Sequence, residues 1–289
     1  MNYWQTSRRR ISLERPIVMG ILNVTPDSFS DGGKFAAVDA ANYRAEAMIS
    51  EGVDIIDIGG ESTRPGAQRV PADVEIDRVV PVIEAIAKRF DVPISIDTTR
   101  SEAAIRAADS GAEIINDISG LRFDPAIASV AASTGAGLIL MHSRGDFEEM
   151  HSQPPMDDMF GNVVTVLSDS LSTAITVGVD PANIAVDIGI GFGKTMAQNL
   201  ELIAKVGKLA DEFKGHAIVV GTSRKSFIGR LLGGVEPDAR LNGSLATAVI
   251  AVWNGAHIVR VHDVGATVEA LKVAAALVSA SKPNEDKAP

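Results

Sequence analysis

The chain of 289 residues contains no cysteine, few aromatic residues and no excess of positive charge. Without cysteine it cannot form disulfides, thiolate nucleophiles, iron–sulfur clusters or cysteine-ligated zinc sites. Only 4% of the residues are aromatic and the net charge is -10, so the stacking surface and the electrostatic attraction of a nucleic-acid-binding protein are both missing. We therefore expect no nucleic-acid partner, and the absence of cysteine favours a cytoplasmic location.

Long hydrophobic runs are missing as well. No uninterrupted apolar stretch approaches the roughly 20 residues that a membrane helix requires. Residues 8–10 are all arginine and could open a secretion signal, but Glu14 and Pro16 follow before any apolar segment forms. We expect no membrane partner, a solvated N-terminal lead-in over residues 1–16 and a frayed polar tail over residues 281–289.

The chain does contain eight short apolar runs separated by helix-length stretches. They lie near residues 17–23, 53–58, 93–97, 113–118, 137–142, 183–187, 217–221 and 258–262. Continuous Val/Ile/Leu runs are typical of buried parallel strands, and the stretches between them show the apolar spacing of three and four that is typical of helices. Eight such units predict an α/β fold, a single-domain (β/α)8 TIM barrel over residues 17–280.

Nearly every run ends at a polar residue. These endings are Asn23, Asp57, Asp97, Asn116, His142, Asp187, the cluster of residues 223–225, and His262. The carboxyl ends of barrel strands meet at the catalytic face, so the pattern predicts a ring of polar groups there. On the last run a side-chain period of two places Arg260 and His262 on one face, where an acidic partner or a bound anion must balance their charge. A structural salt bridge to one of the ring carboxylates is an equal alternative.

Two long loops follow the first two runs. Residues 23–33 and 59–67 combine glycines, hydroxyls and Arg64, which suits lids that close over a phosphate. The alternative is a pair of surface loops rich in turn-forming residues. Residues 221–229 bring two basic side chains and Ser226 to a helix N-terminus and predict an anion site, although a capped helix with solvated cations would look similar.

The glycine-rich segment 189–195 ends like a phosphate-binding P-loop, but Ile188 stands where that motif needs glycine. We interpret it as a barrel loop behind Asp187, with Phe192 available to cover a flat ligand. His142 is ambiguous. No histidine pair has metal-ligand spacing, so we expect no built-in zinc or iron site, and His151 looks like an ordinary surface or helix histidine.

Three strand-end residues and one lysine could together bind the edge of a heterocycle. Asp97 and Asp187 accept hydrogen bonds, Asn116 both donates and accepts, and Lys225 donates. Each residue alone could instead cap a helix or brace a loop, but this explanation is weak for the whole set.

Residues 19–33 and 57–66 resemble the two signature segments of the dihydropteroate synthase family. The resemblance continues in the family's order through Asp97-Thr98, Asn116-Asp117, residues 187–194, 223–226 and 260–264. It departs at Ile188, where the family commonly has proline, and at Ser143-Arg144, which follow Met141-His142 in place of the usual Met-Gln. Neither departure touches the expected site residues.

The resemblance implies a transferase of folate biosynthesis. Such an enzyme joins 6-hydroxymethyl-7,8-dihydropterin diphosphate to 4-aminobenzoate and yields 7,8-dihydropteroate and diphosphate, by SN1-like departure of the diphosphate. It also implies Mg²⁺ as cofactor, membership of a family that sulfonamides target, and a homodimer. An inactive pterin-binding paralogue and a pterin-dependent methyltransferase barrel are the alternatives, and the second would not need Asn23, the lid loops or the Arg260–His262 pair.

The resemblance also assigns roles to matching residues of this chain. The pterin is expected at Asp97, Asn116, Asp187 and Lys225, and the diphosphate at Asn23, Thr63, Arg260 and His262, with Asn23 acting through the metal. The 4-aminobenzoate site is expected at Phe29, Pro65, Phe192, Lys225 and Ser226, and the catalytic group is Asp97, Lys225, Arg64 and Thr63.

Overall fold

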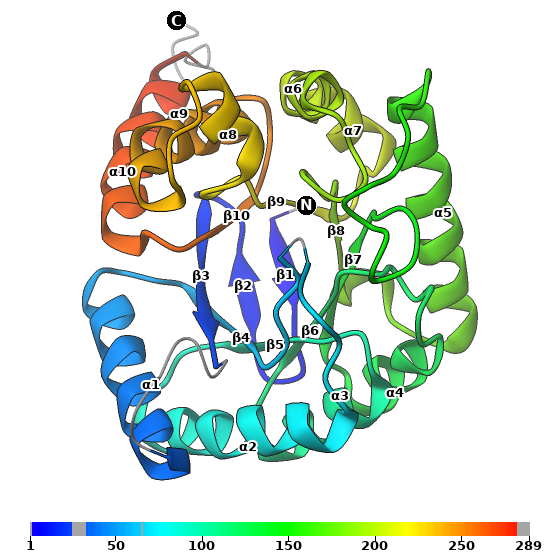
Figure 1. Ribbon diagram of the computed structural model, residues 1–289. Coiled ribbons are helices and arrows are strands. Elements are labelled where there is room, and N and C mark those ends of the chain that lie inside the picture. The colour runs from blue at the N-terminus through cyan, green and yellow to red at the C-terminus, as the bar shows by residue number, and fades with distance from the viewer. Residues whose placement is uncertain (1, 25–32, 65, 282–289) are drawn as a thin grey trace, which may run out of the picture.

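The computed structural model describes residues 2–24, 33–64 and 66–281. They form a closed barrel of eight parallel strands surrounded by helices (Figure 1). The barrel strands are β3 (Ile17–Asn23), β4 (Ile55–Gly59), β5 (Ile94–Asp97), β6 (Ile114–Asp117), β7 (Gly137–Met141), β8 (Ile184–Asp187), β9 (Ala217–Val220) and β10 (Ile258–Val261). Neighbours in the barrel follow the chain order, and β10 closes it by pairing with β3 and β9. The predicted (β/α)8 TIM barrel is confirmed.

The helices fill the stretches between strands. They are α1 (Gly33–Ser50), α2 (Ala72–Arg89), α3 (Ser101–Ser110), α4 (Ala126–Thr134), α5 (Met159–Val177), α6 (Met196–Ala204), α7 (Val206–Glu212), α8 (Ser226–Leu231), α9 (Leu241–Trp253) and α10 (Val264–Ser281), with short 3-10 turns η2 (Pro181–Asn183) and η3 (Pro237–Arg240). In α2, apolar residues at steps of three and four, Val79, Val82, Ile83 and Ile86, are at most 1% exposed. They form the core between helix and barrel.

α5 is the one helix among the described residues that is long and apolar enough to cross a membrane by length and composition. It lies against β7 and α4 in the ring of barrel helices, and it buries Val163 and Leu167 fully in the core. Its polar residue Asn162 bonds to the buried His142. These contacts are those of a barrel helix.

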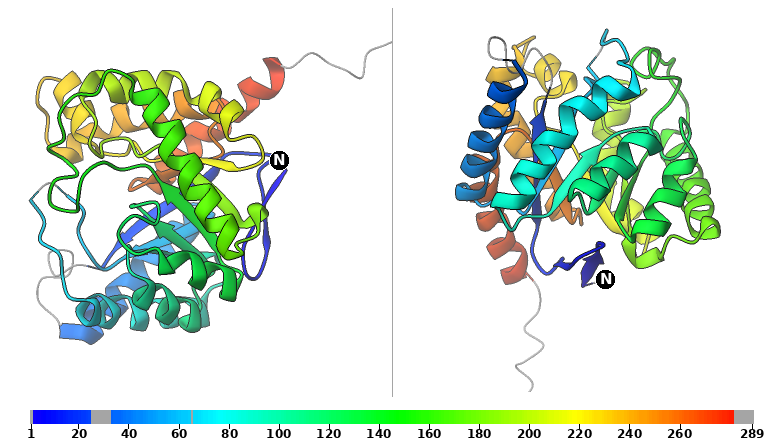
Figure 2. Two further views of the ribbon diagram at one scale, coloured as in Figure 1. Left: turned by 90° about the vertical axis from the view of Figure 1, so that its right-hand side faces the viewer. Right: turned by 90° about the horizontal axis from the view of Figure 1, so that it is seen from below.

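The N-terminal segment is a β-hairpin, not the solvated lead-in that we expected. β1 (Tyr3–Gln5) pairs with β2 (Arg10–Ser12) in antiparallel fashion. The hairpin lies at the end of the barrel opposite the loops that follow β4 and β7 (Figure 2). Trp4 is 0% exposed and packs among inward-facing residues of the barrel strands. The expectation was wrong because the barrel interior exposes an apolar layer at this end, and Trp4 covers it.

Polar contacts hold the hairpin in place. Trp4 donates its indole N–H to the Asn183 carbonyl at 2.8 Å. The buried Glu113 accepts from Thr6 Oγ1 at 2.7 Å and from Arg9 Nε at 3.1 Å. A buried carboxylate is therefore paired and hydrogen-bonded, as its burial demands. At the other end of the chain Ser281 closes α10, and the rest of the expected frayed tail lies outside the described residues.

Candidate active site

Arg260 lies at the centre of the strand-end ring. Its Nε donates to Asp57 Oδ2 and its Nη2 to Asp97 Oδ2, both at 2.6 Å. Asp57 Oδ2 also accepts from Asn116 Nδ2 at 3.1 Å. Four side chains from β4, β5, β6 and β10 therefore meet at one point, because the register of a parallel barrel brings these strand ends together.

Burial shifts the pKa values of the ionisable side chains in this group. Burial raises the pKa of Asp97 to about 7, and the Arg260 guanidinium opposes that shift while Asp57 adds to it. For Arg260 burial alone would lower the pKa, but the Asp57 and Asp97 carboxylates raise it above its ordinary value. Arg260 therefore stays charged, and Asp97 changes its protonation near neutral pH.

A second group surrounds Lys225, at the start of α8. Its ammonium donates to the Ile190 carbonyl and lies 4.7 Å from the centre of the Phe192 ring, a cation–π contact. Burial lowers the pKa of Lys225 to about 8, while the Asp187 charge opposes this. Burial also raises the pKa of Asp187, whose Oδ1 accepts from the Gly189 N–H at 2.7 Å.

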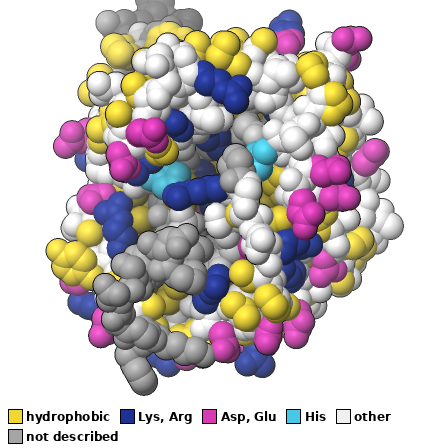
Figure 3. Space-filling model, in the orientation of Figure 1, with side chains coloured by type: hydrophobic (Ala, Val, Ile, Leu, Met, Phe, Trp, Pro, Cys, Tyr) yellow, Lys and Arg dark blue, Asp and Glu magenta, His cyan; other side chains and the backbone are white. Residues whose placement is uncertain are grey.

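Two glycines join these groups to each other and to Asn23. A Cβ at Gly59 would lie 3.6 Å from both Asn23 Oδ1 and Asp97 Cβ, so these side chains flank the glycine. A Cβ at Gly221 would lie 3.7 Å from Arg260 Cβ and 3.9 Å from Lys225 Nζ. The strand ends thus form one continuous polar surface from Asn23 to Lys225. In Figure 3 basic and histidine side chains gather around a hollow at the middle of this face.

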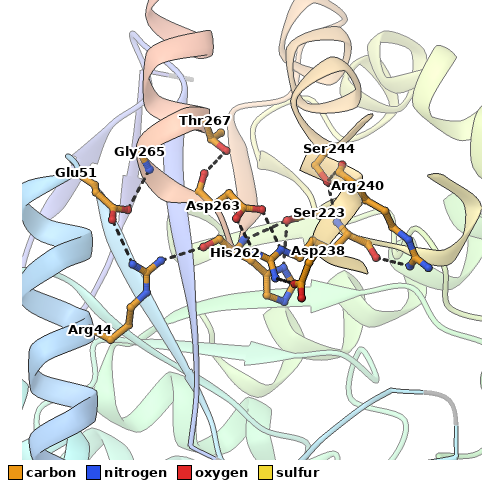
Figure 4. Close-up of polar contacts among 11 residues, drawn as sticks. Arg44, Glu51, Ser223, Asp238, Arg240, Ser244, His262, Asp263, Gly265 and Thr267 are labelled. Atoms are coloured by element: carbon orange, nitrogen blue, oxygen red, sulfur yellow. Dashed lines mark hydrogen bonds and ion pairs between the residues drawn. The ribbon is translucent and has the colours of Figure 1, made fainter. Parts of the chain in front are cut away.

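His262 lies just beyond β10. Its backbone N–H donates to Ser223 Oγ at 3.1 Å, its Nδ1 lies 3.1 Å from the same oxygen, and Arg44 donates to its carbonyl at 3.1 Å (Figure 4). Burial, reinforced by the charges of Arg260 and Arg224, lowers the pKa of His262 to about 4. The imidazole is therefore neutral at pH 7, and Arg260 carries the charge of the predicted cationic pair.

Residues 19–262 match the family model described as pterin binding enzyme. The dihydropteroate synthases of Synechocystis and Escherichia coli are 47% and 46% identical to the chain, covering 91% and 94% of it and 91% and 95% of their own lengths. The solved Xanthomonas albilineans dihydropteroate synthase with 4-aminobenzoic acid has a TM-score of 0.89 and 40% identity over 98% of this chain and 99% of that one. The Yersinia pestis enzyme, solved with a sulfonamide drug, has a TM-score of 0.89 and 44% identity over 96% and 99%.

The chain belongs to the dihydropteroate synthase family. The family predicted from the two signature segments is confirmed, and with it the transferase class and the place in folate synthesis. The pterin-dependent methyltransferase alternative is disfavoured, because relatives that cover nearly the whole chain are named dihydropteroate synthases.

Several residues that the family resemblance singled out lie at the rim. Thr63 and Arg64 belong to the loop after β4; Arg64 is exposed, and its charge helps to lower the pKa of His262, which puts it at the same mouth. Ser226 is exposed at the start of α8. Phe29 and Pro65 lie outside the described residues.

The anion site expected at the basic cluster before α8 stays a prediction, but one of its two cations is already paired. Arg224 is committed to carboxylates: its Nε and Nη2 donate to Asp263 at 3.0 and 2.6 Å, and its Nη1 donates to Asp238 at 2.7 Å. Arg240 holds the Arg224 carbonyl at 2.8 Å, and the contacts around Asp263 appear in Figure 4. Of the two cations in this turn, Lys225 is the one that lies against the Phe192 ring and interacts with the Asp187 charge.

The sequence analysis did not predict a side chain that supports the glycine-rich loop after β8. Lys194 Nζ lies 2.8 Å from His142 Nδ1 and donates to the carbonyls of Gly189 and Phe192 at 2.7 and 3.1 Å. The His142 Nε2 is 3.1 Å from Asn162 Oδ1, which sets the tautomer with the proton on Nε2. Lys194, which in the sequence resembles the lysine of a P-loop, therefore supports the glycine-rich loop from inside the protein.

Two more residues with a place in the site were missed. Asp57 was identified as a strand ending but received no role, although it links Arg260 to Asn116. His151 was predicted to be an ordinary histidine, yet its ring lies between the Thr63 and Gly191 carbonyls. Backbone carbonyls leave no trace in the sequence, so no residue pattern could have indicated the contacts of His151.

Proposed function

We propose that the polar surface from Asn23 to Lys225 binds 6-hydroxymethyl-7,8-dihydropterin diphosphate and 4-aminobenzoate and joins them to 7,8-dihydropteroate, with release of diphosphate. The observation that carries this proposal is the convergence of Asp97, Asn116 and Arg260 beside Lys225. It supplies acceptors and donors for a heterocycle and a fixed cation next to it. This is the arrangement that the family roles require.

The pterin would lie across the strand ends. Asp97 and Asp187 present carboxylates to its N–H donors, and Asn116 and Lys225 can reach its acceptors. As the bond to the diphosphate breaks, positive charge grows on the pterin methyl carbon, and a nearby carboxylate at Asp97 stabilises that charge. Asp97 must be ionised for this role, and its pKa of about 7 permits it at neutral and higher pH.

The diphosphate would bind toward Arg260 and His262. Nε and Nη2 of Arg260 are committed to Asp57 and Asp97, while no described residue accepts a hydrogen bond from its Nη1. That group can therefore donate to a phosphate oxygen without breaking the buried ion pairs. A neutral His262 can donate one hydrogen bond through its ring, and Arg64 at the rim adds positive charge.

Mg²⁺ fits the donor set at Asn23. Among the described residues no cluster of three or more His, Cys, Asp or Glu side chains could hold a metal by itself. Mg²⁺ commonly takes one or two protein oxygens and completes its shell with substrate phosphates and water, so the Asn23 amide oxygen with the diphosphate would suffice. When bound, the ion would neutralise charge on the leaving group.

The 4-aminobenzoate would lie against Phe192, which is 8% exposed and already faces the Lys225 ammonium. Exposed Ser226 would contact its carboxylate, so that the amine points inward to the pterin carbon. The Yersinia pestis relative was solved with a sulfonamide drug, and we propose that the same pocket of this chain accepts sulfonamides.

The direct test is product formation. The purified chain with Mg²⁺ and the pterin diphosphate should form dihydropteroate and one equivalent of diphosphate only when 4-aminobenzoate is added. Absence of product with both substrates bound would identify the inactive paralogue. Absence of product, together with methyl transfer when a methylated pterin donor and an acceptor are supplied in a separate assay, would identify the methyltransferase alternative.

We also propose a cytoplasmic homodimer. Large apolar side chains are exposed on the last two helices: Ile250 and Trp253 on α9, and Val273 and Leu277 on α10, between 49% and 63% exposed. The two helices pack side by side, so these residues offer an apolar face for a second copy. Sedimentation of the wild type and of Trp253→Asp would test it, with a monomer expected only for the variant.

A further inference from the structure

His151 touches two loops that come from distant parts of the barrel. It lies in the segment between β7 and α5. Its Nε2 is 2.7 Å from the Thr63 carbonyl in the loop after β4, and its Nδ1 is 3.3 Å from the Gly191 carbonyl in the loop after β8. Its ring also lies 5.3 Å from the Phe192 ring, centre to centre, at an angle of 36°.

Both ring nitrogens of His151 contact backbone carbonyl oxygens, so they hold the backbone of the two loops. A carbonyl oxygen only accepts, so a ring nitrogen that bonds to it carries a proton. The position of Thr63 is therefore tied through one side chain to the position of Gly191. Gly191 in turn packs on Lys225, because a Cβ there would lie 3.1 Å from Lys225 Cδ.

The segment that carries His151 has a firm base. The neighbouring Met150 is 0% exposed and packs with Phe147 and Phe192 in a small apolar cluster at the mouth. Arg69, from the loop after β4, lies 5.0 Å from the centre of the Phe147 ring. The backbone next to His151 is therefore held by a packed apolar cluster, and His151 links the two loops from this fixed position.

The two loops serve different substrates in the proposed function, on which this inference rests. Thr63 is on the diphosphate side, whereas Gly191 and Phe192 are on the aminobenzoate side. We propose that His151 is a positioning residue that couples the two subsites. When the diphosphate draws the Thr63 loop inward, the His151 bridge brings the Phe192 loop into the position that 4-aminobenzoate requires.

The experiment is calorimetry of 4-aminobenzoate binding, with and without pterin and Mg²⁺-diphosphate, on four full-length proteins. His151→Phe keeps a ring on Phe192 but removes both ring nitrogens. His151→Gln removes the ring but keeps an amide that can donate. His216→Gln is the matched control, because His216 contacts the Ile184 carbonyl where β8 begins, far from the mouth.

We expect Mg²⁺-diphosphate and pterin to tighten aminobenzoate binding to the wild type and the control by the same factor. That factor should fall about tenfold in His151→Phe, as expected for a lost hydrogen bond, and recover to within about threefold of the wild type in His151→Gln. Melting temperatures of all four should agree, because His151 is only half-buried. If His151→Phe does not fold, His151→Ala tests the same loss of donors.

An unchanged factor in a folded His151→Phe or His151→Ala overturns the proposal. So does a wild type that forms dihydropteroate but binds aminobenzoate equally well in both conditions. If the wild type forms no product, the proposed function fails instead, and the measured factor still decides whether His151 couples the two loops.

Discussion

Arg260 bonds to carboxylates that are 203 and 163 residues away in the chain. The side-chain period of its strand was enough to predict that it faces the barrel mouth. It could not choose between a bound anion and a structural ion pair, because the pairing depends on how the last strand closes the barrel against the first. The structure shows the ion pairs, and Nη1, which has no hydrogen-bond acceptor among the described residues, is the group that we propose for the anion.

Replacing Arg260 by alanine should therefore have two effects. The affinity for the pterin diphosphate should fall by about 2 kcal/mol or more, since a charge-assisted contact is lost. The free energy of unfolding should fall by about 3 kcal/mol, because the buried Asp57 and Asp97 lose their counter-charge. Calorimetry and denaturant unfolding measure the two. In Arg89→Ala, which breaks an exposed pair with Glu46, both values should change by less than about 1 kcal/mol.

The pH profile of kcat/KM should be bell-shaped. Burial raises the pKa of Asp97 to about 7, so the required carboxylate forms as pH rises through 7. Burial lowers the pKa of Lys225 to about 8, so the ammonium is lost above 8. The maximum should lie between these values, and Asp97→Asn should lack the rising limb. A rising limb that survives in Asp97→Asn would assign it to another group.

The same shift makes a prediction about stability. A carboxyl whose pKa is raised in the folded chain contributes stability that is complete below its ordinary value of 3.8 and is lost as pH rises through about 7. The melting temperature of the wild type should therefore fall relative to Asp97→Asn between pH 4 and pH 8. A constant difference between the two proteins across this range would contradict the buried, shifted carboxyl.

At the scale of elements, the apolar runs located all eight barrel strands to within about two residues. The hairpin of β1 and β2 was missed because each strand has only three residues and the turn between them is polar and basic. So short a pair is stable only against the barrel end that it covers. The glycine-rich loop was located correctly, but its support by Lys194 depends on carbonyl positions that no residue type reveals.

Lys194→Met should lower the free energy of unfolding by about 2–4 kcal/mol. The variant keeps the length of the side chain but leaves the Gly189 and Phe192 carbonyls and His142 Nδ1 without their donor. Urea denaturation measures the loss. The control is Lys208→Met on α7, where the lysine is exposed and a change of less than about 0.5 kcal/mol is expected. Equal stability of both variants would mean that the loop holds its shape without the brace.

At the scale of the whole molecule, the two ends of the barrel do different work. The end covered by the hairpin is apolar and sealed by Trp4, and the opposite end carries the polar groups, the loops and the hollow of Figure 3. Barrel enzymes generally divide stability and chemistry in this way. The polar strand endings predicted the catalytic end, whereas the hairpin that covers the other end became known only from the structure.

Trp4→Ala should lower the free energy of unfolding by about 3–5 kcal/mol, because a fully buried indole and its bond to the Asn183 carbonyl are lost. Turnover of the folded fraction should stay within about twofold of the wild type. Tyr3→Ala, at a neighbouring residue that is 38% exposed, should change stability by less than about 1 kcal/mol. Thermal and urea unfolding distinguish the two.

The division between a catalytic end and a stabilising end of the barrel is tested most directly by comparing two variants, Asp97→Asn and Trp4→Ala. Turnover and melting temperature are measured for each. Asn keeps the size and most hydrogen bonding of Asp97 but removes the charge that the reaction needs. We predict that dihydropteroate formation falls at least about 100-fold while the melting temperature moves by only a few degrees, the reverse of the result for Trp4→Ala. Asp97→Asn with near-normal turnover and a severe loss of folding would contradict the account.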